Sequence, residues 1–269
     1  RRDGKRLANR VQAAEKVYQS SPLESKDRGG HSSIPRKDTP IYRLAAALLE
    51  VQALEFPARL TETTREYFRR MASLEPGPVG QAMAAIAQDP ADRVALATLD
   101  AEPLTHAILR TTCVATLVEA GHASNALPQQ ARATVNCRLL PGERPEEVQA
   151  TLARAIADPG VAISMLREAH SGVVSDPTPL DPAIFGAIER QTAAMWPGVP
   201  VVPFMSTGAT DGIFFRNVGI PVYGVSGLFG DIEDNRSHGR DERMKVESFY
   251  EGQEFLSRLV RDLAGVPRP

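Results

Sequence analysis

The chain has 269 residues, a formal net charge of −2 and 24% charged residues, which are ordinary values for a globular protein. This length is sufficient for one large domain or two ordinary domains with a substantial buried core. The near-neutral charge gives no sign of a nucleic-acid or anionic-membrane partner, and no apolar run approaches the roughly 20 residues of a membrane-spanning helix. The expected partners therefore include neither nucleic acid nor a membrane.

The N-terminal residues Arg1–Lys5 include neither an initiator Met nor a signal-peptide pattern. This stretch is typical of the inside of a loop, so we expect further sequence upstream. The localisation of the protein is therefore left unassigned.

The first hundred residues predict a strand followed by helices. Lys16–Gln19 is strand-like, and a helix is expected near Thr39, because Asp38 or Thr39 can cap it and Pro40 suits its first turn. Residues 58–100 are expected to be mostly helical. The predicted apolar face of the helix near Thr39 consists of Ile41, Leu44, Ala45, Leu48 and Leu49.

The middle of the chain predicts a half-buried sheet. Residues 106–120 alternate hydroxyl and apolar side chains, and residues 131–139 alternate apolar with polar ones, which is the period of a strand with one buried face. A helix is expected from Pro145 and a further strand at 161–166. This pattern predicts a small module of sheet and helices.

The two cysteines, Cys113 and Cys137, both lie in these strand patterns. They are too few and too far apart for a metal knuckle or a redox motif. Buried free thiols are expected rather than a disulfide.

The last third of the chain follows a proline-rich linker at 171–182, a candidate domain boundary. A helix capped by Asp181 should follow, and the apolar run 220–225 predicts a strand covered on both faces. The final helix is expected to end just before Gly265. Its predicted inward side chains are Phe249, Leu256, Leu259, Val260 and Leu263. The fold class is therefore α/β, with part of a larger buried sheet after the linker.

Three clusters combine tight-turn glycines with polar groups suited to chemistry. His31, after Gly29-Gly30, can donate a hydrogen bond to a polarised carbonyl, or it can simply stabilise its loop. Residues 207–212 either expose backbone amides that hold a carboxylate or form a plain turn. The third cluster, 235–243, carries His238, which taken alone is a weak metal signal.

Taken together and in order, six motifs resemble the zinc aminoacylase and carboxypeptidase superfamily, and most closely its carboxypeptidase S branch. Each motif is weak alone, but their order spans most of the chain. The six are Gly30-His31-Ser32-Ser33-Ile34-Pro35, Leu109-Arg110-Thr111-Thr112, Asn125-Ala126-Leu127-Pro128 leading into Asn136-Cys137-Arg138-Leu139, Gly208-Ala209-Thr210-Asp211-Gly212, Ile220-Pro221-Val222-Tyr223-Gly224 and His238-Gly239-Arg240-Asp241-Glu242-Arg243.

This resemblance implies a two-domain dinuclear-zinc exopeptidase architecture, in which an α+β lid and dimerisation domain is inserted into a catalytic α/β domain. Residues 1–20 and 173–269 would belong to the catalytic domain, and residues 21–172 would form the lid. The implied chemistry is zinc-dependent hydrolysis of a peptide or N-acyl amino acid next to a free carboxylate. The implied assembly is a homodimer through the lid.

The resemblance also implies a role for each site residue. His31 would polarise the scissile carbonyl in the partner subunit's site, and His238 would bind one of two zinc ions. Asn125, Arg138 and the amide of Gly208 would bind the substrate carboxylate, and a guanidinium on a polar strand face suits that role.

Several of the family's residues have no counterpart in this sequence: a His-x-Asp ligand pair, a Glu-Glu pair with the general base, and a further acidic ligand. Because two-metal hydrolysis needs the whole ligand set and a base, the chain alone is expected to be inactive and to bind no stoichiometric zinc. Two alternatives remain. One is a non-catalytic dimerisation or amino-acid-binding module. The other is a serine hydrolase, disfavoured because residues 224–228 lack the second glycine of a nucleophile elbow.

Overall fold

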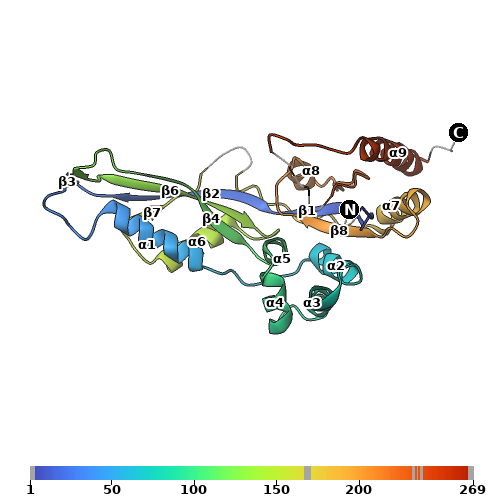
Figure 1. The fold of residues 1–269 in the computed structure, drawn as a ribbon, viewed down its shortest axis with the longest axis horizontal. Coiled ribbons are helices and arrows are strands. Elements are labelled where there is room, and N and C mark those ends of the chain that lie inside the picture. The colour runs from blue at the N-terminus through green and yellow to red at the C-terminus, as the bar shows by residue number, and fades with distance from the viewer. Residues whose placement is uncertain (1–3, 167–170, 232–233, 235, 237–238, 266–269) are drawn as a thin grey trace.

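Three β-sheets organise residues 4–166, 171–231, 234, 236 and 239–265, the part of the chain that the computed structural model describes (Figure 1). A four-stranded sheet lies toward one end of the long axis and a two-stranded parallel sheet toward the other. A small two-stranded sheet lies at the outer tip of the four-stranded sheet. No helix among these residues is long and apolar enough to cross a membrane.

The four-stranded antiparallel sheet has the strand order β4-β6-β2-β7. Its long strands pair over nearly their whole length, with Val17 opposite Leu139 and Lys26 opposite Gln130. The predicted alternation of residues 131–139 is confirmed, because apolar residues of β6 face the core and polar ones face away. The strand bounds are β2 (Val17–Lys26), β4 (Thr112–Ala120), β6 (Gln130–Leu139) and β7 (Val161–Ile163).

Two helices, α1 (Pro40–Ala53) and α6 (Pro145–Ile156), cover one face of this sheet. Both begin with proline in the first turn, as the sequence predicts. The apolar face predicted for α1 is wrong in part, since Ile41 and Leu49 are 41% and 64% exposed. The helix buries a stripe rotated from the predicted one, consisting of Leu44, Ala47 and Val51.

The parallel sheet pairs β1 (Asn9–Glu15) with β8 (Val201–Ser206). Four helices pack with it through one apolar cluster that includes Phe68, Ile86 and Leu99 from the helices and Val202 and Met205 from β8. These helices are α2 (Glu62–Met71), α3 (Gly77–Gln88), α4 (Arg93–Asp100) and α5 (Pro103–Leu109). The segment 21–172 therefore contributes strands to the four-stranded sheet and helices that pack against the parallel sheet.

The strand predicted from residue 106 is wrong at its start. The chain is helical to Leu109 in α5, and the strand begins at Thr112. Pro103 in its first turn and the buried pair Ile108 and Leu109 favour a short helix, because these side chains complete the cluster beneath α4. Only the later part of the predicted strand is extended.

A second apolar cluster joins the parallel sheet to α7 (Pro182–Met195) and α9 (Val246–Leu263). Asp181 caps α7 as predicted, accepting a hydrogen bond from the amide of Ala183 at 2.8 Å. The side chains predicted to face inward from α9 are wrong except for Leu259. The helix buries Ser248, Gly252, Phe255 and Leu259 and leaves the neighbouring stripe exposed.

The segment 220–225 is not the doubly covered strand predicted from its apolar residues. Its pairing with β1 is limited to one isolated bridge, between Gly224 and Gln12, and Ile220 is 51% exposed. Pro221 has no amide to donate to a ladder, which limits regular pairing here. The short helix α8 (Gly212–Asn217) precedes this segment.

Cys113 and Cys137 form a disulfide, which corrects the expectation of free thiols. The register of β4 and β6 places the two residues directly opposite each other. Their sequence patterns indicated strands correctly, but the pairing follows from a register that spacing alone does not reveal.

Candidate functional site

His31 and Asn125 lie together at the tip of the four-stranded unit. The short strands β3 (Gly30–His31) and β5 (Ala126–Leu127) pair there, and the amide of Ser32 donates to the carbonyl of Asn125 at 3.0 Å. Gly29 has a φ of +75°, and a Cβ at this position would lie 2.7 Å from Cγ of Gln129. The glycine before the histidine motif is therefore required by the turn.

The imidazole of His31 is exposed, and its Nδ1 faces back toward its own loop. The amide of Ser33 donates to Nδ1 at 3.2 Å, and the Ser33 hydroxyl lies 2.7 Å from the same atom. Because Nδ1 accepts the amide proton, a neutral ring carries its proton on Nε2. The outward-facing nitrogen is then a hydrogen-bond donor.

Arg138 lies at the other end of β6, opposite Tyr18 on one side and Thr112 on the other. Its Cζ lies 4.7 Å from the Tyr18 ring centroid, and its Nε donates to Oδ1 of Asn136 at 3.2 Å. Burial lowers the pKa of the Arg138 guanidinium, and the Tyr18 hydroxyl opposes this shift. Within the described residues, no carboxylate pairs with this half-buried cation.

Gly208 lies in the loop that follows β8. Its amide donates to Oγ of Ser206 at 3.1 Å, so it is already engaged within the loop. The next amides, of Ala209, Thr210 and Asp211, have no acceptor among the described residues, and these three residues are exposed. The donors available for a ligand are therefore these neighbours.

The junction of the two larger sheets brings Arg138 and this loop into one region. The amide of Lys16, between β1 and β2, donates to the carbonyl of Ser206 at 2.9 Å. Two residues further along, Tyr18 stacks under Arg138. The Lys16 ammonium is buried and donates to the carbonyl of Arg110 at 2.7 Å, and burial lowers the pKa of Lys16 to about 7.

The four expected site residues that lie among the described ones thus form two separate groups. His31 and Asn125 lie at the tip, whereas Arg138 and the loop of Gly208 lie at the junction (Figure 1). The strand from Gln130 to Arg138 alone spans about 27 Å at roughly 3.4 Å per residue. One copy of the chain does not bring the two groups to the same small ligand.

His238, the expected zinc ligand, lies outside the described residues. Among the residues that are described, no group of three or more His, Cys, Asp or Glu side chains could hold a metal ion. The described residues by themselves do not fit a zinc site.

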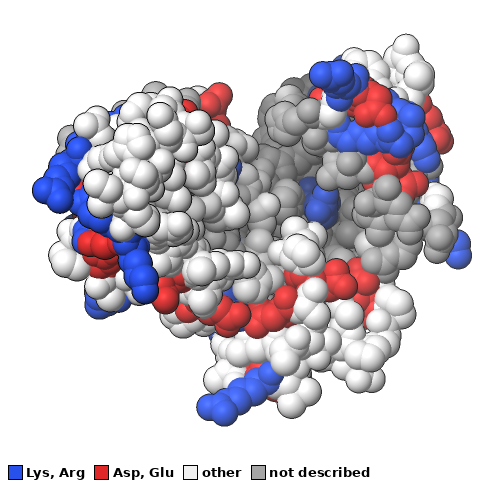
Figure 2. Space-filling view, turned by 60° about the vertical axis from the view of Figure 1, so that its left-hand side comes forward, with Lys and Arg blue, Asp and Glu red and all other residues white. Residues whose placement is uncertain are grey.

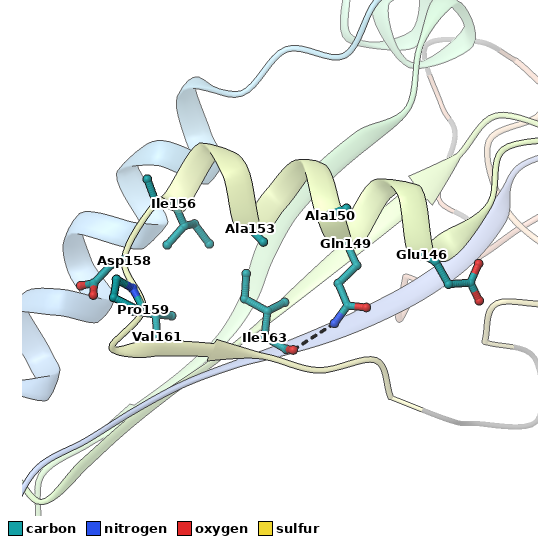
Figure 3. A pocket seen from close by; sticks show the side chains of 10 residues that line it. Glu146, Gln149, Ala150, Ala153, Ile156, Asp158, Pro159, Val161 and Ile163 are labelled. Carbon is teal, nitrogen blue, oxygen red and sulfur yellow. Dashed lines mark hydrogen bonds between the residues drawn. The ribbon is translucent and has the colours of Figure 1, made fainter.

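A cavity of about 410 Å³ lies between α6 and β7, where Gln149 donates to the carbonyl of Ile163 at 2.9 Å (Figure 3). None of the expected site residues lines this cavity, so it is not the expected substrate site. On the face shown in Figure 2, acidic groups form a band across the lower middle, basic groups gather mainly at the two sides, and the described side chains form no continuous basic stripe.

Comparison with known proteins identifies the family. The model of the peptidase dimerisation domain of M20 proteins matches residues 14–163. The human N-fatty-acyl-amino acid synthase/hydrolase PM20D1 is 30% identical over 262 residues, which cover 94% of this chain and 50% of that protein. Probable carboxypeptidase S-like 2 of Dictyostelium discoideum is 26% identical over 240 residues, which cover 87% of this chain and 44% of that protein. The chain thus spans about half the length of the curated relatives it matches.

Solved structures agree on the fold. The M20 family metallo-carboxypeptidase Sso-CP2 from Sulfolobus solfataricus has a TM-score of 0.65 at 18% identity, covering 94% of this chain and 60% of that one. Human carnosine dipeptidase 1 has a TM-score of 0.62 at 13% identity, covering 97% and 58%. These likenesses confirm the expected two-part α/β architecture. With a family model covering more than half of its residues, the chain belongs to the M20 peptidase family and carries that family's dimerisation domain.

Proposed function

We propose that the protein containing this chain is a zinc-dependent hydrolase that cleaves an amide or peptide bond next to a free carboxylate. The names of its relatives support this class, since one is an N-fatty-acyl-amino acid synthase/hydrolase and another a carboxypeptidase S-like protein. In this proposal the chain supplies substrate-binding residues, a histidine donor and the dimer contact.

Arg138 is the observation that carries the proposal. A half-buried guanidinium without a carboxylate partner among the described residues is energetically unfavourable unless an anion binds to it. The Tyr18 ring and Asn136 hold the planar group in one orientation, which suits a two-pronged contact with a carboxylate. The free carboxylate of an N-acyl amino acid or a peptide is the ligand we assign to it.

The loop after β8 would contribute to the same carboxylate through its backbone. The amides of Ala209 to Asp211 are exposed and have no acceptor among the described residues, and successive free amides favour anions. Gly208, whose own amide is engaged with Ser206, would then shape the loop rather than contact the substrate. Asn125 is assigned to the substrate on the tip side.

His31 would act in the site of a second copy. Its Nε2 is the outward donor expected for polarising a carbonyl oxygen, yet it lies too far from Arg138 of its own chain. A second copy that places its tip at the junction of the first would complete the site. This arrangement makes the homodimer part of the chemistry.

The surface we assign to the dimer is the free edge of the four-stranded sheet. The edge strand β4 exposes Val114, Leu117 and Val118 at 60–63%, and the neighbouring α1 exposes Tyr42 and Leu49 at 63% and 64%. An exposed apolar edge strand is a template for pairing with another chain. This surface lies within residues 14–163, the part matched by the dimerisation-domain model.

His238 is the zinc ligand we propose within this chain, and the remaining ligands would come from the rest of the longer protein. One imidazole does not hold zinc tightly, because protein zinc sites take three or four protein ligands. When bound, zinc would supply Lewis-acid activation at the scissile bond. The residues of this chain would bind the carboxylate and donate a hydrogen bond to the carbonyl.

The test is metal content together with hydrolysis. The full-length protein is expected to contain zinc by elemental analysis and to release the amino acid from an N-acyl amino acid, losing activity on chelation and regaining it with zinc. A zinc-free protein that binds N-acyl amino acids without hydrolysing them would instead indicate a non-catalytic binding module and overturn the proposal.

A further inference from the structure

A buried ion pair connects the two ends of the loop that follows β8. Glu15, the last residue of β1, is aligned with Ser206, the last residue of β8. The carboxylate of Glu15 accepts a hydrogen bond from the guanidinium of Arg216, which lies on α8 after the loop. The chain thus leaves β8 beside Glu15 and returns to Glu15 through Arg216.

This pair is shielded from solvent more fully than the other ion pairs of the described residues. The side chains of Arg216 and Glu15 are 5% and 0% exposed. Nε of Arg216 donates to the hydroxyl of Ser175 at 3.2 Å, and Nε2 of Gln12 lies 3.4 Å from the second carboxylate oxygen. Because a buried charge that loses its partner is strongly unfavourable, this geometry is held firmly.

The loop itself is short, and both of its ends are held close to the pair. The carbonyl of Ser206 accepts from Lys16, and the amide of Gly212 donates to Oγ1 of Thr210 at 3.2 Å. A Cβ added at Gly212 would lie 3.1 Å from Nη1 of Arg216. The guanidinium therefore packs directly against the point where the loop enters α8.

We infer that Glu15 and Arg216 are positioning residues that hold the amides of residues 209–211 in the orientation that receives the substrate carboxylate. The inference rests on the proposed function, since it assigns a ligand to those amides. Donors that are fixed before the ligand arrives bind it without reorganisation, whereas a loop released at one end must be ordered at each binding event. Neither residue is assigned a contact with the substrate.

The experiment compares Glu15→Gln, Arg216→Lys and Asp100→Asn in the full-length protein. Glu15→Gln keeps the shape but removes the charge, and Arg216→Lys keeps the charge but loses the forked donor. Asp100→Asn is the matched control, because it breaks the ion pair of Asp100 with the buried Arg110, which is not part of the loop. Steady-state kinetics on an N-acyl amino acid and amide hydrogen exchange over residues 206–213 are measured for each.

Glu15→Gln is expected to raise KM by about tenfold or more, with kcat changed by less than about threefold, and to speed exchange of the hydrogen-bonded amides of Gly208, Gly212 and Ile213. Arg216→Lys should fall between Glu15→Gln and wild type, and Asp100→Asn should leave KM and exchange in this loop unchanged. Unchanged KM and exchange in folded Glu15→Gln protein would overturn the inference, as would an equal effect of Asp100→Asn. If the wild-type protein hydrolyses nothing, the proposed function fails, and the exchange data alone still decide whether the pair holds the loop.

Discussion

The guanidinium of Arg138 lies over the ring of Tyr18, with Cζ 4.7 Å from the ring centroid, on the sheet face opposite α1 and α6. The aromatic face stabilises the cation without neutralising it. Its electrostatic attraction for an anion is therefore retained, and the group is held ready for a carboxylate.

Replacing Arg138 by Met in the full-length protein is expected to lower kcat/KM for an N-acyl amino acid by the equivalent of about 2–5 kcal/mol, as for other buried charge contacts. Arg132→Met is the matched control, because Arg132 lies on the same strand but is exposed and paired with Glu24. The control should retain nearly full activity. Equal losses in both variants would show that Arg138 has a structural role only.

The dimer proposal predicts that a charge on the exposed strand edge separates the subunits. Leu117→Lys places an ammonium on β4, and sedimentation velocity should show a shift from dimer toward monomer. Val94→Lys is the control, since Val94 is 78% exposed on α4, outside the proposed surface. A variant at Leu117 that stays dimeric would place the interface elsewhere.

A mixed dimer tests whether His31 serves the partner's site. His31→Ala and Arg138→Met chains should each be nearly inactive as homodimers. If each site combines Arg138 of one chain with His31 of the other, the mixed dimer contains one intact site and should show about half of the wild-type turnover. No recovery on mixing would mean that both residues act within one chain or that one has no role.

Lys16 predicts a pH dependence of stability. Burial lowers the pKa of its ammonium from 10.5 to about 7, so between these values the unfolded chain binds a proton that the folded chain does not. Stability from this group therefore rises as pH increases from about 7, by up to about 1.4 kcal/mol per pH unit. Between pH 6 and pH 9, the free energy of unfolding of the wild type, measured with a denaturant, should increase relative to that of Lys16→Met. Lys245→Met, at an exposed site, should show no such trend.

The sequence predicts most elements whose signal is local. Asp181 followed by Pro182 marks a helix start, and the alternation of residues 131–139 assigns Arg138 to the polar face. These signals succeed because a cap and a period of two depend on neighbouring residues only.

Features that depend on tertiary packing were not predicted. Strand β8 is a short apolar run interrupted by Pro203, a pattern that does not distinguish a buried strand from other buried segments. Helix α9 carries two adjacent apolar stripes, and only the packing of Phe255 and Leu259 against the sheet decides which one is buried.

In the candidate site, too, the local motifs were predicted and the tertiary arrangement was not. The motifs identify His31 and Arg138 as functional candidates, but strand pairing places them at opposite ends of the four-stranded unit. Likewise, Glu15 and Arg216 are 201 positions apart in sequence, and no local sequence pattern predicts that they pair.

The central claim is that the protein hydrolyses a bond next to a free carboxylate and that Arg138 binds this carboxylate. One pair of substrates tests it most directly. The full-length protein is assayed on an N-acyl amino acid and on the same compound with its carboxylate converted to an amide. We predict that kcat/KM falls for the amide by the equivalent of about 2–5 kcal/mol, and that Arg138→Met abolishes most of this preference. Equal rates on the two compounds in the wild-type protein would contradict the account.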